Sequence, residues 1–112
     1  MNRKLRLTST KDFQRVRRIG RSYAHPFVVM IIGRNDQGRT RIGVTSSRGM
    51  SPAVVRNRAK RRLREALRPH IERLASGWDI VFVARKPLLE ANWEDLGTAV
   101  RSLIEQAGLL EP

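Results

Sequence analysis

Hydrophobic residues recur in this chain with two periods, and each period predicts one kind of element. Between residues 55 and 67 the apolar side chains lie three or four positions apart. At about 100° per residue, this spacing places them on one side of an α-helix. The helix is expected to run to about Arg68, where Pro69 ends or bends it, and Ser51 and Pro52 fit its N-cap and first turn. Its apolar positions are Val55, Ala59, Leu63, Ala66 and Leu67.

Two more segments carry helical patterns. The first begins after Thr8 or Ser9, either of which can cap a helix, and ends at about residue 19, before Gly20. The last begins after Asn92, which is a favourable N-cap, and stops at Gly108. Its apolar stripe, which we expect in the core, consists of Trp93, Leu96, Val100, Leu103, Ile104 and Ala107.

Short runs rich in β-branched and aromatic residues predict the strands. Residues 33–38 form a turn segment that is expected to join the strands on either side of it as a hairpin. Pro26 separates the first two runs, and residues 85–87 interrupt the chain after the last one. The runs are residues 23–24, 27–32, 39–46 and 79–84.

The order of the predicted elements is helix, two or three strands, helix, strand, helix. This order is typical of an α/β or α+β sandwich, here a small, mostly antiparallel sheet of about four strands with three helices. The length of 112 residues suits one domain, residues 1–112, without repeats or low-complexity linkers. Residues 1–8 form a basic lead-in that we expect to be mobile until bound.

The positive charge is concentrated in the first part of the chain. The net charge is +13, and residues 1–64 hold 18 Lys or Arg and 2 Asp or Glu, a net of +16. Residues 65–112 hold 5 Lys or Arg and 8 Asp or Glu, a net of −3. So uneven a field favours a polyanionic partner, which could be nucleic acid or an anionic membrane. Most of the cations are arginines, whose planar fork suits phosphates and base edges.

The central predicted helix carries most of its cations opposite its apolar stripe. Residues 56–68 include seven Lys or Arg and one acid. A solvated face of an amphipathic helix is the ordinary explanation of a charge run, but the shortage of balancing acids favours a surface for a phosphate backbone. The stripe consists of Asn57, Lys60, Arg61, Arg64 and Arg68, with Arg58 and Arg62 at its flanks.

The sequence offers little support for a catalyst or a membrane protein. There is no cysteine, so disulfides and thiolate metal sites are not expected. No apolar run approaches the ~18 residues of a membrane span, and the N-terminus lacks a signal peptide, so a soluble cytoplasmic protein is expected. His25 and His70 stand alone, and no catalytic or nucleotide-binding motif occurs. If the chain belongs to an enzyme, the reactive groups are expected in something that it binds.

Three aromatic residues bear on the kind of nucleic acid. Phe82 and Trp93 are most simply core residues. Phe13 lies on a helix crowded with cations, where its ring can stack on an unpaired base of single-stranded RNA. Core packing explains Phe13 equally well, and a place at the edge of a cleft satisfies both.

The basic helix resembles the signature helix of a known family. The stretch Arg56-Asn57-Arg58-x-Lys60-Arg61-x-x-Arg64-Glu65 is similar to that of the bacterial ribonuclease P protein component. The resemblance covers most of the chain. Further matching segments are Asp12-Phe13 with Gly20, Arg41-Ile42-Gly43 with Ser47-Arg48, Ala53-Val54-Val55, and residues 79–85.

The resemblance implies the small subunit of a ribonucleoprotein endonuclease that removes the 5′ leader from precursor tRNA. In that family the RNA subunit holds the catalytic Mg²⁺ ions, while the protein docks on the catalytic RNA and grips the single-stranded leader in a cleft. No catalytic residue, no tightly bound metal, no membrane contact and no protein oligomer are therefore expected for the chain. A left-handed β-α-β crossover is also implied, although about 98% of crossovers are right-handed.

The stripe and the resemblance together assign roles to individual residues. Arg17 stands where a second aromatic often follows Phe13, so leader stacking would give way in part to phosphate pairing or cation–π contact. Gly49 replaces a cation, and Ser51-Pro52 replaces a Gly-Asn turn. The residues expected to face RNA are Arg56, Asn57, Arg58, Lys60, Arg61, Arg62, Arg64 and Arg68. Those expected at the leader cleft, between the first helix and the sheet, are Phe13, Arg17, Phe27, Ser47 and Arg48.

Two other functions stay open on the sequence. The first is a structured-RNA-binding protein of ribosomal-protein type, which shares the charge argument but has no link to cleavage. The second is a DNA-binding helix, since Arg-Asn-Arg can contact base edges in a major groove. No helix-turn-helix spacing precedes the basic helix, which disfavours the second.

Overall fold

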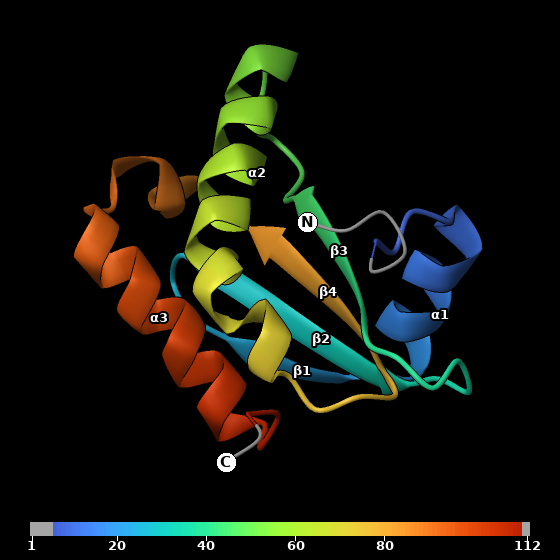
Figure 1. Ribbon diagram of the computed structural model, residues 1–112. Coiled ribbons are helices and arrows are strands. Elements are labelled where there is room, and N and C mark those ends of the chain that lie inside the picture. Colours follow the sequence, from blue (N-terminus) through green and yellow to red (C-terminus); the bar gives the residue numbers. More distant parts are fainter. Residues whose placement is uncertain (1–5, 111–112) are drawn as a thin grey trace.

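A mixed sheet of four strands forms the centre of the molecule, and three α-helices cover its two faces (Figure 1). The computed structural model describes residues 6–110. Two short 3-10 helices, η2 and η3, flank the last strand along the chain. In order, the elements are α1 (Thr10–Ile19), β1 (Arg21–Ala24), β2 (Val28–Arg34), β3 (Arg41–Ser46), α2 (Ala53–Leu67), η2 (Arg68–Arg73), β4 (Trp78–Ala84), η3 (Lys86–Glu90) and α3 (Trp93–Gln106).

The last strand of the sequence lies inside the sheet. The strand order is β1-β2-β4-β3, with β2 antiparallel and β3 parallel to β4. Ile80, Val81 and Phe82 of β4 are all fully buried, although successive residues of a strand point to opposite faces. A strand that is apolar on both faces is most stable between two neighbours. The predicted α+β sandwich, with about four mostly antiparallel strands, is confirmed.

The hairpin predicted across residues 33–38 was wrong. The strands on either side of it, β2 and β3, are not paired, because β4 lies between them. The backbone N–H of Asn35 donates instead to the carbonyl of Gly77, just before β4 (2.9 Å). A turn sequence encodes a change of direction, whereas the choice of neighbour depends on which strand offers apolar surface to both sides.

The path from β3 through α2 to β4 is a β-α-β crossover between parallel neighbours. In Figure 1 the chain rises along β3, descends along α2 in front of the sheet, and rises again along β4, to the left of β3. This path is left-handed, as the resemblance implied, and differs from the usual hand of such connections.

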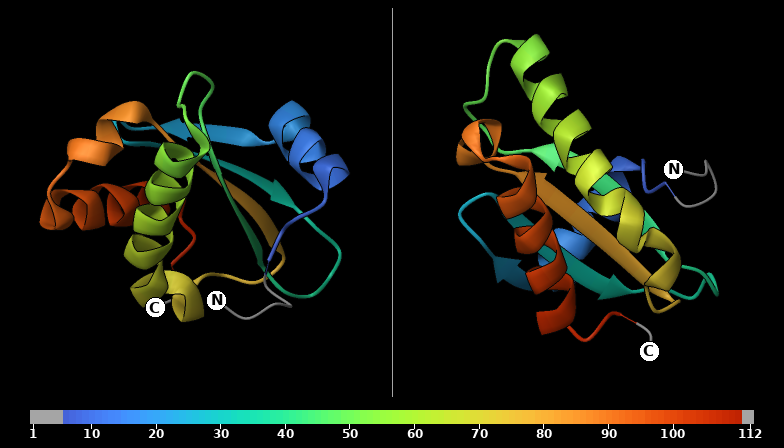
Figure 2. Two further views of the ribbon diagram at one scale, coloured as in Figure 1. Left: turned by 90° about the horizontal axis from the view of Figure 1, so that it is seen from above. Right: turned by 60° about the vertical axis from the view of Figure 1, so that its left-hand side comes forward.

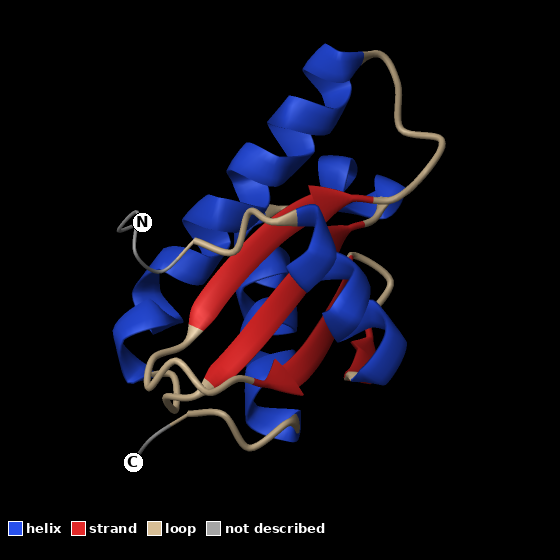
Figure 3. Ribbon diagram, turned by 90° about the vertical axis from the view of Figure 1, so that its right-hand side faces the viewer, coloured by secondary structure: helices blue, strands red, loops and turns tan. Residues whose placement is uncertain are grey.

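The helices divide the hydrophobic core into two unequal parts. Figure 2 shows α2 and α3 on one side of the sheet and α1 on the other. The larger part lies under α2 and α3 and includes Met30, Leu63 and Phe82. The smaller part lies under α1, which Figure 3 shows in front of the strands. Its buried members are Leu7, Val16, Ile31 and Val81.

The predicted helix ends hold with small changes. The side-chain oxygen of Asn92 accepts a hydrogen bond from the backbone N–H of Asp95 (2.8 Å), which confirms the predicted cap. Helix α2 begins at Ala53 with Pro52 as its N-cap, one residue later than expected. At its other end Pro69 is accommodated in η2, so the chain continues as a tighter helix.

Trp93 was predicted in the core, but 53% of it is exposed, whereas Phe82 is fully buried as expected. The other large members of its stripe, Leu96, Val100, Leu103 and Ile104, are buried. Trp93 is the first residue of α3 and lines an open surface pocket with Ala66 and His70. Helical periodicity gives the side on which a residue lies, but not how far the opposing surface extends.

The first described residues lie against the sheet. The N–H of Leu7 donates to the carbonyl of Ile42 on β3 (2.8 Å), and only 3% of Leu7 is exposed. Leu7 thus completes the apolar cluster under α1, while the mobility predicted for the lead-in before binding stays a prediction. Residues 1–5 of that prediction lie outside the described residues.

Candidate nucleic-acid interface

Helix α2 separates an apolar side from a cationic side, as its periodicity predicted. Ala59 and Leu63 are fully buried against the sheet and α3. Arg58, Arg61 and Arg64 are exposed. Since the buried side holds the helix in place, the cations form a row of fixed spacing, unlike those of a flexible basic tail.

Most polar side chains on the exposed side of α2 have no partner within the described part of the chain. Across residues 6–110, none of them makes a hydrogen bond or an ion pair. The first turn of the helix also lacks an acidic residue. A cation without a carboxylate partner keeps its full attraction for phosphate. These side chains are Asn57, Arg58, Lys60, Arg61 and Arg64.

Two arginines near the ends of the row are engaged but exposed. Arg56 donates to the carbonyl of Met50 (3.2 Å), and Arg68 pairs with Glu65 (2.7 Å). Exposed ion pairs contribute about 0–1 kcal/mol, so a phosphate can replace Glu65 at little cost. Both arginines therefore remain compatible with the predicted RNA-facing role.

Arg62 differs from its neighbours in the row. It is partly buried, and its guanidinium donates to the carbonyls of Leu88 (2.7 Å), Leu89 (3.1 Å) and Ala91 (2.7 Å). These carbonyls belong to η3 and to the residue that follows it. Arg62 thus ties α2 to the segment before α3 through a partly buried guanidinium, and its RNA-facing role stays a prediction.

On the opposite face of the sheet, Phe13 of α1 packs against the smaller core cluster while part of its ring remains exposed. The ring lies directly over Gly43 of β3, where an added Cβ would come within 2.5 Å of Cζ of Phe13. Glycine at position 43 therefore allows the ring to approach the strand. This position satisfies both interpretations of Phe13, since the ring is partly core and partly accessible.

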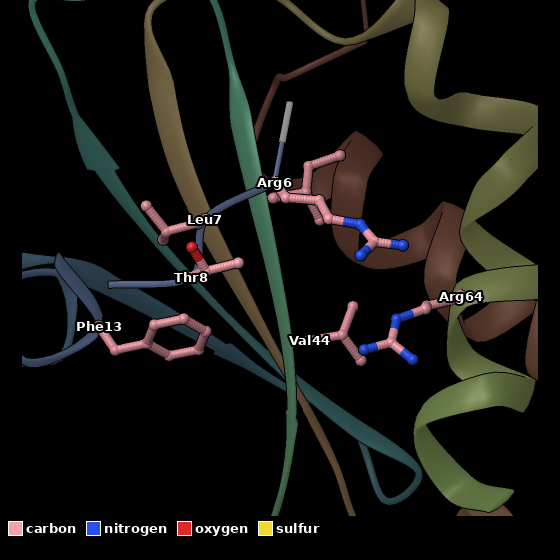
Figure 4. Close-up of a pocket in the computed structure, with 7 residues that line it drawn as sticks. Arg6, Leu7, Thr8, Phe13, Val44 and Arg64 are labelled. Atoms are coloured by element: carbon pink, nitrogen blue, oxygen red, sulfur yellow. The ribbon is translucent and has the colours of Figure 1, made fainter. Parts of the chain in front are cut away.

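A pocket of about 220 Å³ opens at the outer edge of β3. Figure 4 shows Thr8 and Phe13 on one side of this strand and Val44 and Arg64 on the other. The pocket therefore joins the α1 face to the α2 row around the edge of the sheet at β3, where residues 6–7 lie against the strand. Its lining residues are Arg6, Leu7, Thr8, Phe13, Ile42, Val44 and Arg64.

The remaining residues predicted at the leader cleft do not all lie together. Arg17 is exposed on α1, one turn after Phe13. Ser47 and Arg48 follow the end of β3, where the N–H of Ser47 donates to the carbonyl of Ala84 (2.9 Å) and Arg48 is exposed. Phe27 packs instead against the larger core, near α3, with its ring 4.8 Å from that of His25. The structure does not bring Phe27 to the α1 face, because the chain bends between β1 and β2.

A cluster of charged residues that the sequence did not reveal holds α1 on the sheet. Asp79 is fully buried at the start of β4, and Arg41 of β3 donates to both of its oxygens (2.9 and 2.8 Å). Asn35 donates to one oxygen (2.8 Å), and Arg15 of α1 pairs with the other. Arg41 lies beside Asp79 because β3 and β4 pair in parallel with these two residues in register. The sequence could have indicated the contact only if this strand pairing had been known.

Two opposing effects act on the acidity of Asp79. Burial favours the neutral acid and by itself raises the pKa of the carboxyl group. The hydrogen bonds from Arg41, Asn35 and Arg15, together with the charge of Arg41, outweigh burial and lower the pKa of Asp79. The hydrogen bond with Asp79 in turn raises the pKa of Arg41. The carboxylate is therefore ionised whenever the fold is intact near neutral pH.

A family model described as Ribonuclease P matches residues 1–108. The chain belongs to the ribonuclease P protein family. Its sequence is 42% identical to the ribonuclease P protein component of Symbiobacterium thermophilum, over 99% of this chain and 97% of that protein. It is 39% identical to that of Herpetosiphon aurantiacus, over 97% of this chain and 89% of that protein.

Solved ribonuclease P proteins share the fold. The protein from Staphylococcus aureus gives a TM-score of 0.82 at 26% identity, over 96% of this chain and 98% of that one. The protein from Thermotoga maritima gives 0.77 at 27% identity, over 90% of this chain and 96% of that one. The resemblance found in the signature helix is therefore confirmed: the chain belongs to a family of RNA-binding proteins of tRNA processing.

Two further features of the described residues concern metals and membranes. No group of three or more His, Asp or Glu side chains among residues 6–110 is placed to hold a metal ion. Within the same range, no helix combines the length and the apolar character needed to cross a membrane.

Proposed function

We propose that the chain binds the catalytic RNA of ribonuclease P and the 5′ leader of precursor tRNA, and so assists the endonucleolytic removal of that leader. The RNA subunit supplies the catalytic Mg²⁺ ions and the reaction itself, and the complex acts in the cytoplasm. The observation that carries the proposal is the row of unpartnered side chains on α2, in a chain of this family.

The row on α2 suits the backbone of a folded RNA. Lys60, Arg64 and Arg68 follow one another at intervals of four residues, which corresponds to a rise of about 6 Å along the helix. Each of them can therefore meet a different phosphate. Because arginine donates in a planar fork, Arg61 and Arg64 can each bind two oxygens of one phosphate. We assign this surface to the catalytic RNA.

The α1 face suits a single strand. Phe13 offers part of a ring for stacking, and stacking on an aromatic ring needs an unpaired base. Arg17 lies one turn further along α1, and the pocket around β3 leads from Phe13 to Arg64. We assign this surface to the leader, which can reach the α2 row at the edge of β3.

Reconstitution with the cognate catalytic RNA tests the proposal. The purified protein alone is expected to leave precursor tRNA intact, and to increase cleavage by the catalytic RNA most strongly at low Mg²⁺. A magnesium titration with and without the protein measures the effect. If the protein leaves the rate unchanged at every Mg²⁺ concentration, the proposal is wrong.

The length of the leader separates this function from that of a ribosomal-type RNA-binding protein. With the complete complex, affinity for precursor tRNA is expected to rise as the leader is extended by a few nucleotides. A protein that only binds structured RNA predicts no such gain. Competition between folded RNA and duplex DNA at fixed salt addresses the DNA-binding alternative, and we expect RNA to compete better.

A further inference from the structure

One buried carboxylate pairs with both elements that meet at Phe13, namely α1 and β3. Asp79 of β4 pairs with Arg15 of α1 and with Arg41 of β3. We propose that Asp79, acting through Arg15, is a positioning residue for the leader: it fixes α1 against the sheet and thereby places Phe13 at the edge of β3. The inference rests on the proposed function and adds to it the residues that set the geometry of the leader surface.

Helix α1 depends on its contacts with the sheet because it is short and few of its residues are buried. It has ten residues, and Val16 is the only one of them that is fully buried. Isolated helices shorter than about 12–15 residues are marginal in water, so tertiary contacts decide whether and where such a helix forms. Lys11, Arg17 and Arg18 are exposed and contribute no apolar contact.

The backbone fixes how deeply α1 can sit, and the carboxylate fixes its orientation. An added Cβ at Gly20 would lie 2.6 Å from the carbonyl oxygen of Ile32, so the end of α1 touches β2 directly. The ring of Phe13 touches Gly43 of β3 in the same way. Arg15 lies between these two contacts along α1 and reaches β4. Three strands therefore each hold one point of the helix.

The cluster is a structural clamp, since its charges already balance. Asp12 of α1 lies 3.5 Å from Arg15 and 3.5 Å from Arg41, in addition to the pairs with Asp79. Two acids thus face two arginines. Arg15 and Arg41 are only partly exposed, and both are engaged, in contrast to the arginines of the α2 row. Their contribution to RNA binding is therefore expected to come from the placement of α1.

Two substitutions with opposite effects on charge test the clamp. Asp79→Asn makes the protein more positive, and Arg15→Met makes it less positive. A general electrostatic effect predicts that the first strengthens and the second weakens leader binding. The clamp predicts that both weaken it, because both release α1. Arg15→Met leaves the pair of Arg41 with Asp79 intact, so it serves if Asp79→Asn fails to fold.

The measurement is the affinity of the reconstituted complex for precursor tRNA with leaders of increasing length, compared with mature tRNA. In each variant, the gain in affinity that the leader provides is expected to be smaller by roughly five- to tenfold, as when one stacked base is lost. The affinity for mature tRNA is expected to be unchanged. Hydrogen exchange of the free protein should show faster exchange in residues 10–19 and unchanged exchange in residues 53–67. Arg18→Met is the matched control, because it removes a charge from α1 without touching the clamp.

The outcomes separate this inference from the proposed function. If the wild-type complex gains nothing from a leader, the proposed function fails and the inference fails with it. If the wild type gains from the leader and Arg15→Met keeps that gain, only the inference is overturned. The inference is also overturned if Arg18→Met loses as much as Arg15→Met, since charge alone would then explain the loss.

Discussion

Arg61 and Arg62 follow one another on α2, yet their guanidinium groups have different partners. Arg61 is exposed and unpartnered among the described residues, whereas Arg62 donates to three carbonyls in and after η3. Periodicity placed Arg62 at the flank of the stripe, which was correct. It could not show what lies beside that flank, because a group of carbonyls distant in sequence leaves no pattern in residue types.

Arg62→Ala is accordingly expected to affect stability more than RNA binding. It leaves the carbonyls of Leu89 and Ala91 without the donor that Arg62 supplies, and a buried acceptor without a partner costs about 1–3 kcal/mol. Urea denaturation measures the loss, and a salt titration of RNA binding should give nearly the wild-type slope. If Arg62→Ala were as stable as the wild type and its RNA binding depended less on salt, Arg62 would instead contact RNA, as the sequence predicted.

The opposite sides of α2 predict opposite phenotypes for two adjacent residues. Leu63→Ala removes a fully buried side chain and should lower the free energy of unfolding by roughly 2–5 kcal/mol. Arg64→Ala should lower it by less than about 0.5 kcal/mol, as is usual at exposed positions, while weakening RNA binding. Chemical denaturation and a binding titration of both variants compare the two quantities. If Arg64→Ala proved the more destabilising, the assignment of faces would be reversed.

At the scale of elements, the sequence predicted which segments are helices and strands but not how they meet. The helices around Val16, Leu63 and Val100 follow from periodicity, because apolar spacing is a local property. The pairing of β4 with both β2 and β3 is a property of the whole chain, and the turn at residues 33–38 gave the wrong neighbour. The left-handed crossover came only from family resemblance. The clamp was missed for the same reason as the pairing, since Arg15, Arg41 and Asp79 meet only in the folded sheet.

The docking of α1 should depend on pH through Asp79. Its pKa is lower in the folded chain than the value of about 3.9 expected when unfolded. A carboxyl group with a lowered pKa stabilises the fold above its unfolded pKa, and this contribution is lost as the pH falls toward the folded pKa. Unfolding free energy measured in urea should therefore decline below about pH 4. The Asp79→Asn variant should be less stable than the wild type at pH 7, and its unfolding free energy should decline less steeply at acidic pH. If the decline at acidic pH were the same in the variant, Asp79 would be excluded as its cause.

At the scale of the molecule, the charge asymmetry of the sequence becomes an asymmetry of surfaces. Most cations of residues 1–64 lie on or near α1 and α2, while α3 carries the acids Glu94, Asp95 and Glu105 and one cation, Arg101. The exposed surface of α3 is therefore less attractive to a polyanion than those of α1 and α2. The net charge alone predicted a polyanionic partner, but only the fold shows that two faces, joined at the edge of β3, can take part.

Two triple variants test whether the placed row or the net charge drives RNA binding. Replacing Lys60, Arg61 and Arg64 with alanine removes three unpartnered cations from α2. The plot of log K against log salt concentration should become less steep by about 2–3, since each phosphate contact contributes about 0.7–0.9. The control replaces Arg73, Arg85 and Arg101, which are exposed in the less basic part of the chain, and removes the same charge.

The control variant should keep nearly the wild-type slope, because none of its three positions lies on α1 or α2. A small decrease of the slope in both triple variants would reflect long-range electrostatic attraction. Salt screens such attraction beyond about 10 Å at 0.1 M, so this shared decrease should disappear at higher salt concentrations. If the two triples flattened the slope equally at high salt as well, RNA would be responding to the total charge of the protein. The fixed spacing of cations on α2 would then have no special role in holding the catalytic RNA.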